Sequence, residues 1–342
     1  MTAAGNPSAT QRHRAVMRAL PHLYEASRDP TTFADYGGHM VLALALIATT
    51  SRSVRLRRTA GQMGIERVHY WRDRRLSFRA LNGDTIMQAI ITMCAAQRLG
   101  ILDDEIRDHL AREVVSYPLT DLLYFDPAKD EIPDDVPHEC PCGHSNQRGS
   151  RQCGGCGNAL EFQSRYEIWY YALTSVYFCE RCGIPLPVGL GTTLRRVVDL
   201  RPYPPPGAPG SYHAIYAATH IVYILNDYGS TLLSPDWLPK ELSFLRRSVD
   251  WAVEQGEADT LGELVDTLSA LGIPDRDPKI AIARRIIMAS QSPDGTWGDE
   301  GANSYAHFHT LWAAIDGLRE HAWRGVARLD PEVEAALVAL RC

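Results

Sequence analysis

The chain has 342 residues, 45% of them hydrophobic, and a formal net charge of −6 at pH 7. That apolar content suffices for a buried core, and the mild acidity argues against nucleic acid as the main partner. Residues 1–10 lack the order of a signal peptide, and the longest apolar run, residues 40–48, is about half of what a bilayer span needs. We therefore expect a cytoplasmic protein without a membrane span. The excess of arginine over lysine is typical of GC-rich bacterial genomes.

Arginines gather in the segment from Arg52 to Arg75. A basic segment of this kind could contact an anionic ligand or an acidic protein partner. More often it forms the solvated face of a helix, and both interpretations stay open at this point.

A recurring Gly-Ile signal ends several segments that have helical apolar periodicity. The copies are Leu99-Gly100-Ile101, Cys182-Gly183-Ile184, Leu271-Gly272-Ile273 and a weaker Met63-Gly64-Ile65. Glycine supplies the left-handed residue that caps a helix, and the isoleucine can fold back on the last turn. Each copy therefore predicts a helix C-terminus, and the recurrence predicts repeated pairs of helices.

The same periodicity predicts two layers of helices around an axis and almost no strands. The expected inner helices are residues 84–99, 165–182, 211–228, 258–271 and 304–319, and the outer ones are 103–115, 190–200, 238–255 and 277–290. The proline-rich residues 202–209 cannot continue a helix and form a connector. The predicted fold class is all-α, an α/α toroid that residues 1–342 form as a single domain.

Four cysteines have the spacing of a small zinc ribbon inserted over residues 138–160. The turns Cys140-Pro-Cys142-Gly and Cys153-Gly-Gly-Cys156-Gly each offer two thiolates, and their glycines let backbone amides turn toward sulfur. The segment resembles bacterial zinc ribbons of the form CPxCG and CxxCG, which implies one structural zinc without an open coordination position. Free thiols or a disulfide are the alternative.

The first knuckle is one residue shorter than in that pattern, so His138 or His144 could replace a ligand. A saturated zinc site of this kind pins a loop or docks a protein partner. The other cysteines considered, Cys94, Cys179 and Cys182, lie at apolar helix positions and are expected to be buried thiols.

The segment Gln291-Ser-Pro-Asp-Gly295-Thr-Trp297 fits the pattern QxxxGxW, and FHTLWAAIDGL follows at 308–318. These residues resemble the QxxxGxW repeat of terpenoid cyclases and the last inner helix of protein prenyltransferase β subunits. The resemblance covers about residues 280–320 and implies an α/α toroid. In that superfamily the motif ties a helix end to the next turn, so it implies fold more than function.

Two departures limit what this resemblance implies about chemistry. His309 matches a histidine that ligates zinc in the prenyltransferases, and Asp259 can match the aspartate of their Asp-x-Cys pair, but Leu261 replaces the cysteine. The sequence contains no DxDD, so the acid that starts class II terpene cyclisation has no match. The resemblance therefore implies neither the complete prenyltransferase zinc site nor the complete catalytic residues of class II terpene cyclisation.

Polar side chains recur along the inner helices, on a face other than the apolar one. They are His213, His220 and Asp227 in 211–228, Asp259, Glu263 and Asp266 in 258–271, and His309 and Asp316 in 304–319. Two histidines and a carboxylate suit zinc or iron(II) with open positions, so His220, Glu263 and His309 are the predicted ligands of a second metal. Asp259, Asp227 or His213 would be alternates or would orient an imidazole. A polar groove of hydrogen-bonded residues is the alternative interpretation.

The leading hypothesis is a metal-dependent bacterial enzyme that acts on a small, partly apolar metabolite inside the toroid. His220, Glu263, His309 and Asp259 are the candidate catalytic residues, and Tyr212, His213, Tyr305 and His307 are the candidate substrate-binding residues. Prenyl transfer or cyclisation would follow only by analogy of fold. The alternative is a non-catalytic toroid that binds a partner through the zinc ribbon and the Arg52–Arg75 segment.

Overall fold

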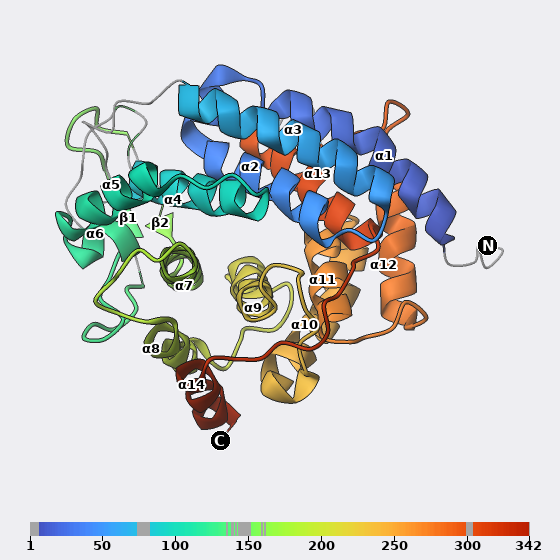
Figure 1. Cartoon of the computed structure of the whole chain (residues 1–342). Helices are drawn as coiled ribbons and strands as arrows, with labels where there is room; N and C mark the ends of the chain where they lie inside the picture. The colour runs from blue at the N-terminus through green and yellow to red at the C-terminus, as the bar shows by residue number, and fades with distance from the viewer. Residues whose placement is uncertain are drawn as a thin grey trace.

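The computed structural model describes residues 7–73, 83–134, 136–137, 140, 142, 152–158, 160, 162–298 and 304–341. Its regular structure is almost entirely α-helical, and six helices contact one another in a closed ring, each with the next and the last with the first. In ring order they are α2 (Pro30–Thr50), α4 (Gly83–Arg98), α7 (Arg165–Arg181), α9 (Ser211–Leu225), α11 (Ala258–Ala270) and α13 (Ser304–Leu318). Figure 1 shows α7 and α9 nearly end-on, whereas α1 and α3 lie across the view. The predicted all-α toroid is therefore confirmed.

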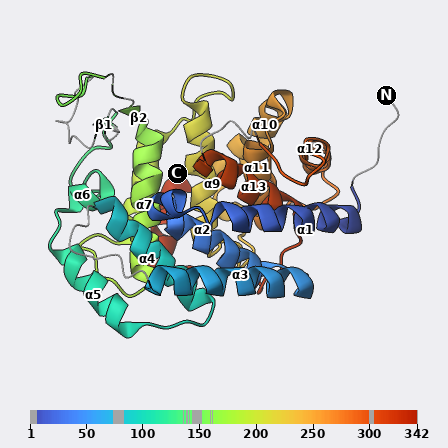
Figure 2. The same cartoon turned by 90° about the horizontal axis from the view of Figure 1, so that it is seen from above.

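A second set of helices packs on the outside of this ring. It comprises α1 (Ala9–Ala26), α3 (Val54–Asp73), α5 (Asp104–Val115), α6 (Leu119–Leu123), α8 (Leu190–Arg195), α10 (Pro239–Gln255), α12 (Pro278–Ala289) and α14 (Pro331–Arg341). Short 3-10 helices cover Arg196–Leu200 and Pro235–Trp237, and the strands β1 (Val136–Pro137) and β2 (Phe162–Gln163) pair antiparallel on either side of the cysteine segment. Seen from above, α10 and α12 lie outside α11 and α13 (Figure 2).

The three clear Gly-Ile signals end helices as predicted. Gly100, Gly183 and Gly272 have φ values of 82°, 68° and 78°. The amide of the following isoleucine donates to a carbonyl five residues back, at 2.9, 2.8 and 3.0 Å respectively. The weaker prediction at Gly64 is wrong, because this residue lies inside α3. A Cβ there would lie 2.9 Å from Leu99 Cδ1, so the glycine permits close helix packing instead.

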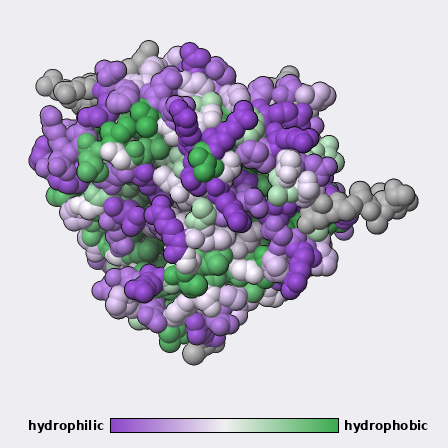
Figure 3. Space-filling view, turned by 45° about the vertical axis from the view of Figure 1, so that its right-hand side comes forward, coloured by the Kyte–Doolittle hydropathy of each residue, from purple (hydrophilic) through white to green (hydrophobic). Residues whose placement is uncertain are grey.

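The apolar run at residues 40–48 belongs to α2, a core helix of the ring. By length and composition α2 is the one helix among the described residues that could cross a membrane, but 67% of its apolar window is buried inside the protein. It packs against α3, α4 and α13. Met40, Leu42 and Leu44 are almost fully buried, and each such side chain contributes about 1.5–3 kcal/mol to stability. On the face drawn in Figure 3, hydrophilic residues cover much of the surface and apolar residues lie between them in smaller areas.

The QxxxGxW motif joins the end of α12 to α1, which confirms the structural role expected for it. The Gln291 side-chain amide donates to the carbonyls of Ala15 and Gly295 at 3.0 and 2.9 Å. The Trp297 indole is fully buried and donates to the Ile287 carbonyl at 2.6 Å. These contacts satisfy buried polar groups where the chain leaves a helix.

Two of the three cysteines that we expected to be free thiols are instead bonded to each other. Cys94 of α4 and Cys182, directly after α7, form a disulfide with a Cα–Cα distance of 5.8 Å. Their separation of 88 residues hides this proximity from the sequence, because only the ring brings α4 beside α7. Cys179 is a buried thiol as predicted, and burial raises its pKa to about 12.

Candidate active site

A cavity of about 270 Å³ lies inside the ring, with walls from α2, α7, α9, α11 and α13. Tyrosines supply much of the wall, and titratable side chains supply most of the remaining polar surface. The aromatic lining consists of Tyr170, Tyr171, Tyr212, Tyr216, Tyr223, Tyr228, Tyr305 and Trp312. This combination of apolar ring faces with a few convergent polar groups is typical of a small-molecule site.

His309 of α13 and Asp259 of α11 form a close ion pair on the cavity wall. The Nδ1–Oδ1 distance is 2.8 Å, and the two side chains are 18% and 20% exposed. Burial alone would lower the pKa of His309, but the charge and hydrogen bond of Asp259 and the charge of Glu263 raise it to about 9. For Asp259, burial works in the opposite direction, and the contacts with His309 and Tyr216 lower its pKa overall. The pair is therefore an imidazolium bound to a carboxylate at neutral pH.

Glu263 lies one helical turn after Asp259 on α11 and faces the other nitrogen of the same ring. Its Oε1 is 3.6 Å from His309 Nε2. Burial, and to a lesser extent the charge of Asp259, raise the pKa of Glu263 to about 7 against the effect of His309. A carboxyl group with this pKa exchanges a proton readily near neutral pH.

Thr219 of α9 holds the second oxygen of Glu263. The Thr219 hydroxyl lies 2.7 Å from Glu263 Oε2 and 2.9 Å from the Tyr216 carbonyl oxygen. It can donate to the ionised carboxylate, or it can donate to the carbonyl and accept from the protonated acid. Thr219 therefore stays bonded to Glu263 in both protonation states, and its hydrogen bond to the carboxylate lowers the pKa of Glu263.

A chain of hydrogen bonds connects the Asp259–His309 pair to the surface. Tyr216 donates from its hydroxyl to Asp259 Oδ2 at 2.7 Å. The Tyr212 hydroxyl lies 3.2 Å from that of Tyr216, and Tyr212 is 39% exposed. Solvent is thus linked through two hydroxyls and one ion pair to the ring that faces Glu263.

His220 and His39 are neutral members of the wall. Burial lowers the pKa of each to about 4. His220 Nδ1 lies 2.8 Å from the Tyr216 carbonyl oxygen, which can only accept, so Nδ1 carries the proton and Nε2 keeps its lone pair. The imidazole of His220 also stacks on Tyr170 at a centroid distance of 4.4 Å.

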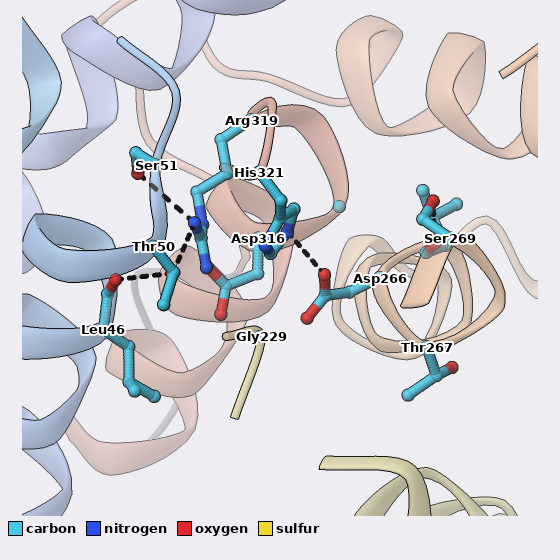
Figure 4. A network of polar contacts seen from close by, with 12 residues as sticks. Leu46, Thr50, Ser51, Gly229, Asp266, Thr267, Ser269, Asp316, Arg319 and His321 are labelled. Atoms are coloured by element: carbon cyan, nitrogen blue, oxygen red, sulfur yellow. Dashed lines mark hydrogen bonds and ion pairs between the residues drawn. The ribbon is translucent and has the colours of Figure 1, made fainter. Parts of the chain in front are cut away.

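A second polar group, which we name the Arg319 cluster, consists of Asp266, Asp316 and Arg319 on the cavity wall and the neighbouring His321 (Figure 4). Arg319 donates to Asp316 and, from Nη1, to the hydroxyls of Thr50 and Ser51 at 2.9 and 3.3 Å. His321 Nε2 lies 2.7 Å from Asp266 Oδ1. Burial raises the pKa of Asp316.

The structure brings most of the predicted site residues to one cavity. His220, Glu263, His309 and Asp259 all line it, as do Tyr212, His213 and Tyr305. His213 lies at the rim, where its Nδ1 is 3.4 Å from Glu167. His307 does not line the cavity. Asp227 does not share a helix face with His220, because α9 ends at Leu225 and Asp227 pairs with Arg98 outside this cavity.

Sequence analysis missed several members of this wall. His39 lies in the apolar helix α2, where its one polar ring among aliphatic residues was the available signal. Thr219 and Arg319 carried no local signal, since threonine is common in helices and Arg319 follows the last turn of α13.

The predicted second metal set is not gathered as tightly as the cysteines are. Within the described part of the chain, the group whose ligand atoms all lie within 4.8 Å of one another is Cys140, Cys142, Cys153 and Cys156. Their Sγ atoms approach to 3.4 Å between Cys140 and Cys156 and to 3.5 Å between Cys142 and Cys153. A tetrahedral zinc with Zn–S bonds of about 2.3 Å has sulfur–sulfur edges of about 3.8 Å, so the four thiols fit one such ion.

The second knuckle also has the geometry of a metal-binding turn. The Gly155 amide donates to Cys153 Sγ at 3.3 Å, and the Gly157 amide donates to the Cys153 carbonyl at 2.8 Å. Gly157 has a φ of 76°, which favours glycine at this position. The proposed substitute ligands His138 and His144 lie outside the described residues.

Comparisons with known proteins give a partial sequence match and a distant structural likeness. Residues 176–315, less than half of the chain, match a family described as a domain of unknown function (DUF6895). No curated protein sequence matches the chain. Among solved structures, the apo form of the type II terpene cyclase MstE from Scytonema has a TM-score of 0.48 and 13% identity, over 91% of this chain and 98% of that chain.

A variant of the same enzyme, in complex with its substrate geranylgeranyl dihydroxybenzoate, has a TM-score of 0.42 and 14% identity. That likeness covers 96% of this chain and 98% of the other. Values of this size assign neither an activity nor a substrate to the present chain.

Proposed function

We propose that the protein is an enzyme that performs acid–base chemistry on a small, partly apolar metabolite in the cavity of the ring. Glu263 is the group that gives or takes the proton, and the Asp259–His309 pair keeps a positive charge beside it. The observation that carries this proposal is the pKa of Glu263, about 7. Glu263 lies at the cavity wall and faces the Asp259–His309 pair, which hydrogen bonds connect to the exposed Tyr212.

The residues around Glu263 support each part of this role. The His309 imidazolium stabilises the Glu263 carboxylate after the proton leaves. The tyrosine hydroxyls and Asp259 form the route by which the site can regain a proton from solvent. Tyr170, Tyr223 and Tyr305 offer ring faces to the apolar part of the substrate, and they also favour a positive charge that develops during the reaction.

A metal-dependent version of the same site is the second candidate. It is favoured by the separation of 3.6 Å between His309 Nε2 and Glu263 Oε1 and by the lone pair on His220 Nε2. A metal there would need His309 to lose the proton that Asp259 and Glu263 stabilise. We therefore rank proton transfer by Glu263 above metal catalysis.

For the cysteine group we propose a structural zinc ion. The zinc would be held by all four thiolates and would contribute to folding of an insert over residues 138–160 within a single domain. Such an insert is also the proposed contact for a protein partner, and the exposed arginines of α3 are a further candidate surface.

A comparison of cell extracts tests the proposed enzyme activity. Small organic-soluble metabolites from cells that contain the protein are incubated with the wild type, Glu263→Gln or Glu254→Gln, and are then compared by mass spectrometry. Glu254 is an exposed carboxylate on α10 and serves as the matched control. We expect at least one metabolite to be converted by the wild type and the control but not by Glu263→Gln. The proposal is contradicted if no metabolite is converted, or if Glu263→Gln converts the metabolite as well as the wild type does.

Elemental analysis separates the two versions of the site. We expect one zinc per chain, lost in Cys140→Ser/Cys142→Ser and retained in His220→Ala and His309→Ala. A second metal that disappears with His220 or His309 favours the metalloenzyme.

A further inference from the structure

We propose that a recess at the C-terminal ends of α4, α7 and α9 binds a phosphate group, either free phosphate or the phosphate of a small ester. The recess has a volume of about 300 Å³. Its charged lining residues are Arg98, Arg181, Arg324 and Asp227. This site lies apart from the proposed active site and does not depend on its chemistry.

The charges that line the recess do not balance. The described lining residues carry three guanidinium groups and one carboxylate, which leaves two formal positive charges. Asp227 Oδ1 accepts from Arg98 at 2.7 Å and lies 3.3 Å from Arg181 Nε. Arg324 is exposed and has no ion pair in the part of the chain that the structure describes. A dianion such as phosphate would neutralise this excess positive charge, and a single guanidinium group can donate two parallel hydrogen bonds to two phosphate oxygens.

Helix capping explains only part of this arrangement. Arg98 and Arg181 are the last residues of α4 and α7, where the helix dipole favours a cation. That preference accounts for each arginine separately. It does not account for Arg324, which follows α13 in an irregular segment and meets the other two only in the folded ring.

The recess is held in shape before any ligand enters. Asp227 and Tyr228 have φ values of 54° and 48°, which are uncommon for residues other than glycine. Asn226 fixes this turn by accepting from the Gly229 amide at 2.9 Å. The Tyr177 hydroxyl donates to Asp227 at 2.6 Å, and the Arg98 side chain is only 13% exposed. An arginine fixed in this way loses little freedom when an anion binds.

An aromatic wall separates this recess from the main cavity. Tyr177 lines the recess and Tyr228 lines the cavity, with their ring centroids 5.4 Å apart. Along α7, Thr174 is the cavity-lining residue nearest the recess in sequence, and it is separated from Arg181 in the recess by about 10 Å at the rise of an α-helix. Phosphate binding can therefore be measured independently of activity.

Calorimetric titration of the full chain with inorganic phosphate, at pH 8 and low chloride, tests the proposal. We expect saturable binding at one site per chain. Arg181→Gln and Arg324→Gln should each weaken it by at least about tenfold, because each removes a charge-assisted contact. Arg195→Gln is the matched control, since Arg195 is an exposed arginine in the last turn of α8, outside the recess. Arg181 and Arg324 are both exposed, so their substitution should leave the midpoint of thermal unfolding unchanged.

Two further measurements sharpen the result. Asp227→Asn removes the carboxylate that competes for the arginines, so phosphate should bind more tightly to this variant. Malonate, a dianion of two carboxylates, should bind more weakly than phosphate to the wild type. The proposal is overturned if the wild type binds no phosphate, if Arg181→Gln and Arg324→Gln bind like the control, or if malonate binds as tightly.

Discussion

Two histidine–aspartate pairs with nearly the same nitrogen–oxygen distance each place an aspartate on the wall of the main cavity, but they have different surroundings. In the Glu263 cluster, which we define as Asp259, Glu263 and His309, the imidazole lies 2.8 Å from Asp259. In the Arg319 cluster, His321 lies 2.7 Å from Asp266. The pairing of a histidine with an aspartate is therefore not what distinguishes the candidate reactive site.

The two clusters differ in the partners of their charged side chains. The Arg319 side chain is 2% exposed and its donors meet Asp316, Thr50 and Ser51, while Trp323 stacks on His321 at 4.4 Å. The Glu263 cluster instead retains a carboxyl group with a pKa of about 7 facing a neighbouring imidazolium across 3.6 Å. The guanidinium of Arg319, held by these three partners, fixes the end of α13 against the end of α2, whereas a poised acid at a cavity wall can exchange protons.

The largest expected effect is the loss of activity in Glu263→Gln. With the metabolite identified by the extract experiment, we expect the rate to fall about 100-fold to 10,000-fold, the usual contribution of a general acid or base. The amide cannot transfer the proton, but it keeps the size of the side chain and can accept from Thr219. Initial rates at saturating substrate measure the effect. A loss below tenfold would mean that Glu263 only positions the substrate.

Arg319→Met should affect stability more than activity. The substitution leaves Asp316 buried without its cation, and breaking a buried ion pair in this way costs about 3–5 kcal/mol. Urea unfolding followed by circular dichroism gives the free energy of unfolding. Arg58→Met, at an exposed position of α3, is the control and should change it by less than about 0.5 kcal/mol. Equal stability of the two variants would contradict the structural role of the Arg319 cluster.

The pH dependence of stability should differ between the wild type and Glu263→Gln. The folded pKa of Glu263 is about 7, above its ordinary value of 4.5, so its contribution is complete below pH 4.5 and is lost as the pH rises to about 7. Glutamine has no such loss. We expect Glu263→Gln to gain stability relative to the wild type by at most about 3 kcal/mol between pH 5 and pH 8.

Urea unfolding of both proteins at several pH values measures this gain. The difference between them removes the shared contributions of His39, His220 and other groups that titrate in the same range. A constant difference from pH 5 to pH 8 would show that Glu263 titrates normally in the fold.

The smallest expected effect is that of Thr219→Val. The hydrogen bond from Thr219 lowers the pKa of Glu263, so its removal should raise that pKa by about one unit. The carboxyl infrared band of Glu263, assigned by comparison with Glu263→Gln, reports the titration directly. Thr219→Ser keeps the hydroxyl and should titrate like the wild type. A shift of the same size in both variants would rule out the hydrogen bond as the cause.

Much of the helical framework could be predicted because its signals are local. The Gly-Ile caps, the apolar periodicity and the QxxxGxW motif each depend on residues a few positions apart, and the helices they indicate are present within a few residues of the predicted bounds. The exceptions follow from tertiary context. Gly64 looked like a cap but permits close packing against Leu99, and the disulfide between Cys94 and Cys182 joins distant segments.

The candidate site was predicted less completely, for a related reason. Helical spacing placed Asp259 and Glu263 on one face and suggested that His220 and His309 point inward, and all four residues line the cavity. Spacing could not show that His309 carries a proton between two carboxylates, because that depends on where α11 meets α13. Asp227 was assigned to the same face as His220 only because α9 was expected to run three residues further than it does.

The sequence by itself determined the nine helices expected between residues 84 and 319, the spacing of the four cysteines and the identity of the polar residues on each inner helix, since all of these depend on short-range geometry. Only the tertiary structure decided that Glu263 keeps a pKa near neutrality while Arg319 binds Asp316, Thr50 and Ser51, and that three arginines from separate segments meet at one recess. The physical reason is that burial and charge–charge interactions depend on distances between helices, which the ring sets and the local sequence does not.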